Sequence, residues 1–263
     1  MRLSRYSAIA TLLVVLLAVP ASAAVIYTED FSYVAGTNLA GQGGWAAHSG
    51  AGTNPQKIAA SGLTYASYPG SGVGLAVGPT ATSGEDNNHT FTGQTSGDVY
   101  VSFLVNVTST QTTGDYFFHI FDGPVASNAF LGRVFAKKDP ASTNFDFGLQ
   151  FAAAGVTYVG AGTSYNYVPG TTYLIVVKYS FVAGTLNDQV ALFVNPALGG
   201  AEPAATLTVV NPGSSADGTT LDAIAIRQGT AANAPSVTID AIRVSTAWLD
   251  VSTPVSLFNF SID

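Results

Sequence analysis

The feature that most constrains the fold is an alternation of apolar and polar residues with a period of two. In residues 99–107 every odd position is apolar, and Ser102 and Asn106 lie between them. The same alternation runs through residues 145–151 and 173–181. Successive side chains of a strand point to opposite faces of a sheet, so this pattern predicts strands with one buried face.

Shorter apolar segments of similar character fill most of the remaining chain, and turn signals separate them. The 28 glycines and 12 prolines are spread widely, with turn sequences at 113–115, 122–124, 169–170 and 211–213. Beyond the N-terminus no segment has a helical period. We therefore predict an all-β chain that forms one β-sandwich. The further predicted strands are 25–31, 73–77, 88–92, 116–121, 130–136, 189–194, 205–209, 221–227 and 237–244.

The N-terminus predicts export. Arg2 and Arg5 precede an apolar stretch at 8–19 that is too short to span a membrane, and Ala21-Ser22-Ala23 fits a signal-peptidase site. Residues 1–23 are therefore predicted to be a signal peptide, the alternative being an uncleaved anchor. No later apolar run reaches membrane length, so we expect a protein that is secreted or held at a bacterial cell surface, with no transmembrane segment after cleavage.

Composition excludes several classes of function. The formal net charge is −7 and the pI about 4.7, which argues against nucleic acid as a partner because such proteins need a basic surface. The absence of cysteine excludes disulfide scaffolds, thiol catalysis and cysteine-ligated zinc. Hydrophobic residues make up 47% of the chain, enough for a sizeable core.

Six segments, in their order along the chain, resemble the concanavalin A-like lectin/glucanase superfamily, and within it the secreted laminin-G-like domains of bacteria. They lie at 29–45, 63–78, 100–107, 172–179, 187–196 and 237–251. The resemblance implies a jelly-roll sandwich of two curved antiparallel sheets over residues 24–250. Residues 251–263 are predicted to be a linker and the start of a following module, because 254–257 resembles the opening of a fibronectin-like module found in proteins exported by the type IX route. The alternative is an edge strand of the same sandwich.

The resemblance does not bring the catalytic residues of the glucanases. Those enzymes carry Glu-x-Asp-x-Glu or Glu-x-Asp-x-x-Glu on one strand, which places two carboxylates on one face as nucleophile and acid. The three glutamates here, Glu29, Glu85 and Glu202, have no such neighbours. We therefore predict that the chain is not an enzyme.

Asp30 and Asp240 are the candidate metal ligands. Asp240 has the parity of Ile242 and Val244, which predicts an inward carboxylate that needs a partner. The first and last strands of a jelly roll are neighbours, so the two acids can meet, and a hard oxygen site suits calcium. In the laminarinase-like members of the superfamily, acids at matching positions and a backbone carbonyl hold a structural calcium ion. That implies a carbonyl from residues 70–74 here. The alternative is that Asp30 caps a turn and Asp240 pairs with a Lys or Arg.

A second group of candidates would contact a ligand on the sheet. His119 has the parity of Phe117, and Arg133, Asp146 and Gln150 supply hydrogen-bonding groups on predicted strands. The alternative for these residues is core rings and surface polar groups. Taken together, the sequence predicts a secreted, non-catalytic carbohydrate-binding or adhesive domain that binds an extracellular or cell-surface polysaccharide and holds a structural calcium ion. The alternative is a structural spacer or display module of a larger surface protein.

Overall fold

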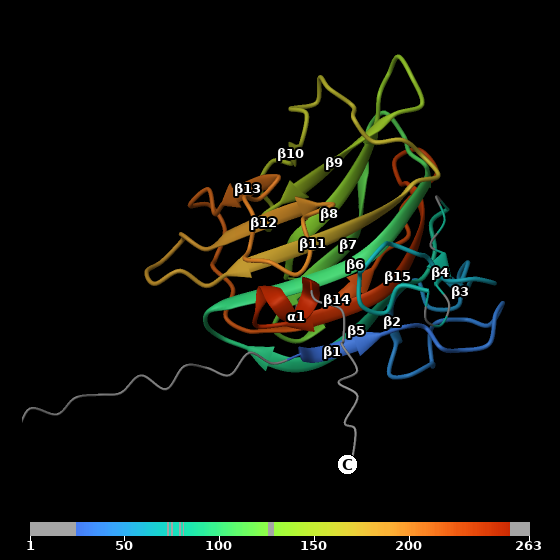
Figure 1. The fold of residues 1–263 in the computed structure, drawn as a ribbon, viewed down its shortest axis with the longest axis horizontal. Coiled ribbons are helices and arrows are strands. Elements are labelled where there is room, and N and C mark those ends of the chain that lie inside the picture. The colour runs from blue at the N-terminus through green and yellow to red at the C-terminus, as the bar shows by residue number, and fades with distance from the viewer. Residues whose placement is uncertain are drawn as a thin grey trace, which may run out of the picture.

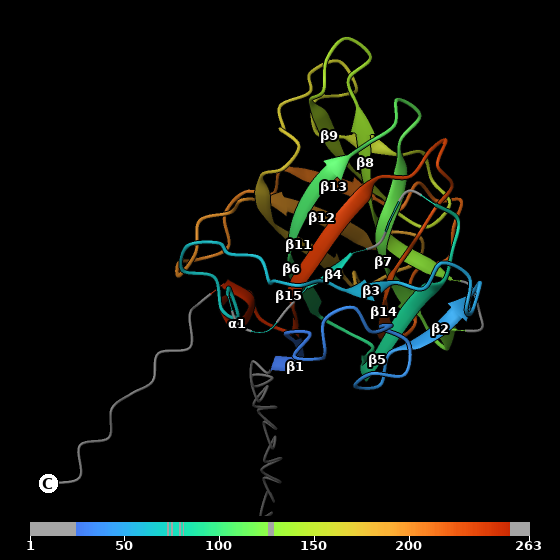
Figure 2. The ribbon, with the colours of Figure 1, turned by 90° about the vertical axis from the view of Figure 1, so that its right-hand side faces the viewer.

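The computed structural model describes residues 25–72, 74, 76–78, 80, 82–125 and 129–252. Within them, two antiparallel sheets stack face to face as a jelly-roll β-sandwich (Figure 1, Figure 2). This confirms the predicted fold class. The predicted signal peptide and residues 253–263 lie outside the described residues.

The first sheet has eight strands, and its longest members form the centre. Strand β6 pairs with β11 on one side and with β15 on the other, and β1 also pairs with β15. The strands, in spatial order, are β13 (Leu207–Val210), β12 (Gln189–Val194), β11 (Thr172–Ser180), β6 (Asp98–Ser109), β15 (Ser236–Ser245), β4 (Val77–Gly78) and β3 (Lys57–Ile58), with β1 (Val25–Glu29) off this path.

The second sheet has seven strands, with β7 and β14 near its centre. The strands, in spatial order, are β10 (Thr157–Tyr158), β9 (Phe145–Gln150), β8 (Phe130–Lys138), β7 (Asp115–Asp122), β14 (Leu221–Ile226), β5 (Asp86–Gln94) and β2 (Ala46–Ser49). We call the side of this sheet that is turned away from the other sheet its outer face.

The core lies between the sheets and follows the period-two pattern of the long strands. The odd positions from Val99 to Val107 are buried in it, as are Phe145, Phe147 and Leu149 of β9. The even residues of these strands lie on the other side of each sheet, and several are also buried there: Tyr100 packs against α1 and Leu104 against Tyr68. The period-two pattern therefore correctly predicts which side of each long strand faces the core between the sheets.

A short helix, α1 (Trp248–Ser252), lies on the outside of the eight-stranded sheet, where Trp248 and Val251 pack against Tyr100 and Phe193 (Figure 1). The sequence predicts no helix here, because five residues are too few to display a helical period. The predicted domain end at residue 250 falls inside this helix. Among the described residues no helix is both long and apolar enough to cross a membrane.

Candidate functional site

The outer face of the seven-stranded sheet carries the four predicted ligand residues, with Asp146 four residues along β9 from Gln150 and opposite Lys137. His119 comes from β7, Arg133 from β8, and Asp146 and Gln150 from β9. Arg133 and Gln150 are direct cross-strand partners. Their shared face follows from parity, since the neighbouring residues 145, 147 and 149 point into the core.

Arg133 is the half-buried cation at the centre of this group. Its Nη1 atom donates a hydrogen bond to Gln150 Oε1 over 2.9 Å, and Gln150 Nε2 in turn donates to the carbonyl oxygen of Ala154. The guanidinium carbon lies 5.1 Å from the ring centroids of both Tyr116 and Phe130. Gln150 therefore orients the guanidinium while the two rings support it.

His119 lies beneath this surface. It is only 1% exposed, and its ring centroid is 4.5 Å from that of Phe130 and 4.8 Å from that of Phe121. Burial holds the pKa of His119 well below its usual value, so the ring is neutral. In this arrangement His119 is part of an aromatic layer, and its contact with a ligand stays a prediction.

Asp146 is also enclosed. The side chain is fully buried, and its Oδ2 atom accepts a hydrogen bond from the Gly160 N–H over 2.6 Å. Burial raises the pKa of Asp146 to about 6, while the backbone donors Gly160 and Phe147 and the cation Lys137 act in the opposite direction. The carboxyl group ties β9 to the loop that follows β10, and its predicted contact with a ligand is untested.

Two residues that sequence reasoning missed complete this surface. Arg227, directly after β14, places its guanidinium carbon 4.1 Å from the ring centroid of Tyr116 and forms a 2.8 Å ion pair with Asp115. Tyr116 also contacts the ring of His119, with the centroids 5.6 Å apart. The predicted shared face of His119 and Phe117 is wrong. The pairing register of β7 shifts between Tyr116 and Phe118, and Phe117 lies in the core.

The candidate metal ligands lie on the other sheet. Strand β1 pairs with β15 through Glu29 and Ile242, so the first and last strands are neighbours, as predicted, with Asp30 directly after β1 and Asp240 in the middle of β15. Asp240 is fully buried, and its two carboxylate oxygens accept hydrogen bonds from the Leu63 and Ala241 N–H groups, each over 2.6 Å. Burial raises the pKa of Asp240 to about 7, and the nearby carboxylate of Asp30 adds to that rise.

The side on which Asp240 lies differs from the prediction. Ile239 and Ile242 both point into the core, because the pairing register of β15 shifts between Asp240 and Arg243 and Ala241 adopts a φ of 51°. The bulge therefore turns Asp240 away from Ile242 and toward residues 62–72 and Gly74, which cover the outside of the sheet. Parity gave the wrong face, although the carboxylate is buried as expected.

Three glycines of this segment let its backbone approach the two acids. A Cβ atom on Gly70 would lie 2.9 Å from Asp30 Oδ1, and one on Gly62 would lie 2.8 Å from Asp240 Oδ2 and 3.1 Å from the Gly74 carbonyl oxygen. A Cβ atom on Gly74 would lie 2.0 Å from the Asp30 carbonyl oxygen. Carboxylate and carbonyl oxygens thus converge on one cradle, a donor set that fits calcium.

The cradle holds only two acids. No three His, Cys, Asp or Glu side chains gather as a metal-binding group anywhere in the described part of the chain. A cation here would therefore take its remaining ligands from backbone carbonyls and water. The charge of Arg243 acts on Asp30, whose pKa burial raises and Arg243 lowers. Asp240 forms no ion pair with a Lys or Arg among the described residues.

Glu29, which precedes Asp30, is a structural hub of the fold. It is 7% exposed, and its carboxylate accepts hydrogen bonds from the Phe31 N–H and from the side chains of Tyr27, Tyr33 and Trp45. Four donors on one carboxylate satisfy it fully within the protein.

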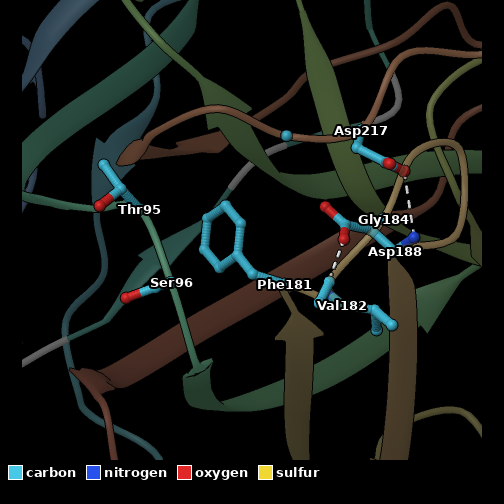
Figure 3. A pocket seen from close by; sticks show the side chains of 9 residues that line it. Thr95, Ser96, Phe181, Val182, Gly184, Asp188 and Asp217 are labelled. Atoms are coloured by element: carbon cyan, nitrogen blue, oxygen red, sulfur yellow. Dashed lines mark hydrogen bonds between the residues drawn. The ribbon is translucent and has the colours of Figure 1, made fainter.

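A pocket of about 340 Å³ opens at one end of the sandwich, beside the β11–β12 turn (Figure 3). Phe181 forms part of its lining, with Thr95 and Ser96 on one side and Asp188 and Asp217 on the other. Both acids are occupied by the protein. Asp188 accepts from Tyr179 Oη and the Val182 N–H, and Asp217 accepts from the N–H groups of residues 187 and 188. The pocket carboxylates therefore hold loops together.

Comparisons with known proteins were made at three levels. No protein-family model matches the chain, and no curated protein matches its sequence. Among solved structures it is similar to domain 4 of the extracellular arabinanase AbnA from Geobacillus stearothermophilus in complex with arabinotriose, with 12% identity, 85% of this chain and 92% of that chain covered, and a TM-score of 0.43.

Two further solved structures have comparable scores. The CBM2 module of the evolved Dit protein of Lactobacillus casei BL23 phage J-1 is 12% identical, with 85% and 95% of the two chains covered and a TM-score of 0.45. An alginate lyase, Aly36B, in complex with an alginate trisaccharide is 13% identical, with 65% and 80% covered and a TM-score of 0.42. At these scores the likeness assigns neither a family nor a ligand to this chain.

Proposed function

We propose that this chain is a secreted, non-catalytic carbohydrate-binding domain that holds its glycan against the outer face of the seven-stranded sheet. The observation that carries the proposal is the Arg133 cluster. Two half-buried rings, Tyr116 and Phe130, flank a guanidinium that Gln150 holds in place. Sugar-binding sites combine apolar ring faces with a few fixed hydrogen-bonding groups.

The donor inventory of the cluster suits a polyhydroxylated ligand. A guanidinium has five N–H donors, and the contact with Gln150 uses one nitrogen of Arg133. The carboxylates of this face are less available, because Asp146 is buried and Asp115 is paired with Arg227. A glycan hydroxyl would therefore meet a donor-rich surface and act mainly as an acceptor.

The absence of catalysis is proposed from the sequence, and the burial of His119 agrees with it; the half-buried His48 lies beside it, with the ring centroids 6.1 Å apart. His119 is 1% exposed, so it offers no accessible base to a bound sugar. None of the three glutamates has the spacing that a glucanase requires. We expect no release of reducing sugars and no unsaturated products from any polysaccharide that the chain binds.

A calcium ion is proposed as a structural support on the opposite side of the molecule. Asp30, Asp240 and the Gly74 carbonyl would hold it. When bound, it would supply the positive charge that two neighbouring carboxylates lack. Its effect on glycan binding would be indirect, since the cradle and the Arg133 cluster lie on different sheets.

The test is a binding screen of residues 24–263 against insoluble and soluble polysaccharides, once in calcium and once in EDTA. We expect binding that the variant Tyr116→Ala abolishes. The control variant Tyr65→Ala removes a half-buried tyrosine that packs on the other sheet and should leave binding unchanged. If the folded chain binds no polysaccharide, the proposal is wrong and the spacer or display alternative takes its place.

A further inference from the structure

The basic residues of this chain are few, and three of them share one face. The sequence contains nine Lys and Arg, two of them within residues 1–23, against sixteen Asp and Glu. Arg133 and Lys137 have the same parity on β8, and Arg227 follows β14, which is separated from β8 by β7. Arg133 and Arg227 lie together at Tyr116, and Lys137 lies farther along β8, over the ring of Tyr158.

Arg133 and Arg227 meet at a single aromatic ring. Their guanidinium carbons lie 5.1 Å and 4.1 Å from the centroid of Tyr116. Two like charges at one ring repel each other, and each would be stabilised by an anion placed between them. Arg227 already has one, because its Nη1 atom is 2.8 Å from Asp115 Oδ2.

Arg133 has no such counter-charge. Among the described residues it forms no ion pair, and its hydrogen bond goes to the neutral amide oxygen of Gln150. Its Nε atom is buried and has no hydrogen-bond partner among the residues that the structure describes. A half-buried guanidinium with a free, buried donor is a costly arrangement unless an anion completes it.

The other acids near the cluster are occupied elsewhere. Asp86 accepts the Gln228 N–H over 2.7 Å, and Asp146 accepts the Gly160 N–H over 2.6 Å. Asp115 is bonded to Arg227 and to the Tyr116 N–H. None of the three forms a hydrogen bond or ion pair with Arg133, so among the described residues no carboxylate pairs directly with this cation.

We propose that the Arg133–Tyr116–Arg227 cluster binds the anionic group of an acidic polysaccharide, a uronate carboxylate or a sulfate ester. Planar guanidinium groups recognise both anions through paired, charge-assisted hydrogen bonds, and Arg133 is the principal contact. This inference rests on the proposed carbohydrate-binding function and specifies its ligand class. The neighbouring aromatic rings would contact the sugar ring, and the two cations would favour an acidic sugar over a neutral one.

The experiment compares polymers that differ only in charge. The full chain from residue 24 is tested by biolayer interferometry against polygalacturonate and its methyl ester, and against carrageenan before and after desulfation. We expect binding to the acidic member of at least one pair, at least about tenfold tighter than to its neutral counterpart, which corresponds to one lost charge-assisted contact. The pair that discriminates identifies the anion. Binding should weaken as sodium chloride is added.

Variants assign the effect to this cluster. Arg133→Gln should lose about tenfold or more in affinity for the acidic polymer, and Arg133→Lys should lose less because it keeps the charge without the planar fork. The control Lys57→Gln changes the net charge equally at an exposed side chain bonded to Asn38 and should bind normally. Circular dichroism and the melting temperature establish that each variant is folded.

The outcomes separate this inference from the function on which it rests. Equal binding to both members of every pair would leave the carbohydrate-binding function standing and overturn the anionic ligand. Acid-selective binding that a folded Arg133→Gln variant retains would overturn the site. No binding to any polymer, charged or neutral, would overturn both.

Discussion

Replacing Glu29 by glutamine should destabilise the fold although the two side chains have the same shape. The Glu29 Oε1 atom accepts the Phe31 N–H over 2.6 Å, and Oε2 accepts Tyr27 Oη, Tyr33 Oη and Trp45 Nε1 over 3.1, 2.8 and 2.8 Å. Phe31 is fully buried and has a φ of 49°, so the hydrogen bond from its N–H stabilises a strained backbone conformation.

A glutamine amide cannot serve all four donors. If its oxygen takes the Oε2 position, the amide nitrogen faces the Phe31 N–H. If its nitrogen takes that position, the tyrosine hydroxyls can accept from it but Trp45 Nε1 cannot. Either orientation leaves one buried N–H without an acceptor, which costs about 1–3 kcal/mol, and the remaining bonds lose their charge assistance. Release of a buried charge offsets part of this. We expect Glu29→Gln to lower the free energy of unfolding by about 2–4 kcal/mol.

Urea unfolding followed by far-ultraviolet circular dichroism measures this change, in calcium and in EDTA. The cost should be the same in both, because all four donors belong to the protein. In a Trp45→Phe background the Nε1–H donor is gone, so the amide nitrogen can take the Oε2 position without leaving a buried N–H unpaired. Glu29→Gln should then cost at least about 1 kcal/mol less than in the wild-type chain. A wild-type cost below about 0.5 kcal/mol, or equal costs in the two backgrounds, would refute the reasoning.

Three further predictions concern calcium, pH and the glycine cradle. Calcium at about 100 times its Kd should stabilise the chain by about 2.7 kcal/mol in thermal unfolding, and Asp240→Asn should remove that response; equal melting in calcium and EDTA would contradict the calcium site. Burial raises the pKa of Asp86 from 3.8 to about 6, so the folded state holds this proton more tightly and loses stability as pH rises from about 4 to 6. Asp86→Asn removes this titration, so between pH 4 and pH 6 the variant should lose about 1–2 kcal/mol less stability than the wild type, after allowance for the partial exposure of Asp86. Urea unfolding at several pH values measures the difference, and parallel pH profiles of the two proteins would contradict the prediction. Gly74→Ala should cost about 1–3 kcal/mol and weaken the calcium response, because Gly74 has a φ of 65° and its Cβ atom would lie 2.0 Å from the Asp30 carbonyl oxygen; an unchanged melting temperature would show that the segment shifts freely.

The long strands were predictable because their burial pattern is local. Strand β12 has the predicted bounds, Gln189–Val194, and β6, β9 and β11 differ from prediction by one or two residues at their ends. The four-residue strand β2 and the two-residue strands β3 and β10 were missed. Two residues cannot show a period, so whether they pair depends on the neighbouring chain.

Part of each candidate site was predictable for the same reason. Residues 133, 146 and 150 share the outer face because β8 and β9 are regular between them, and chain topology alone places Asp30 near Asp240. Arg227 was missed because its ion pair with Asp115 joins segments more than a hundred residues apart. No local pattern in the sequence predicts such a pair.

The errors of parity have one physical cause, and it falls on both candidate sites. A β-bulge adds a residue to one strand and reverses the faces of everything beyond it. One bulge in β7 separates Tyr116 from Phe118 and places Tyr116 beside His119. Another in β15 turns Asp240 toward the glycine cradle. A regular β7 would have sent either Tyr116 or His119 into the core, and a regular β15 would have placed Asp240 on the same face as Ile242. The irregularity that defeats the pattern therefore keeps Tyr116 and His119 together on the outer face, and it lets Ile242 enter the core while Asp240 stays on the other side.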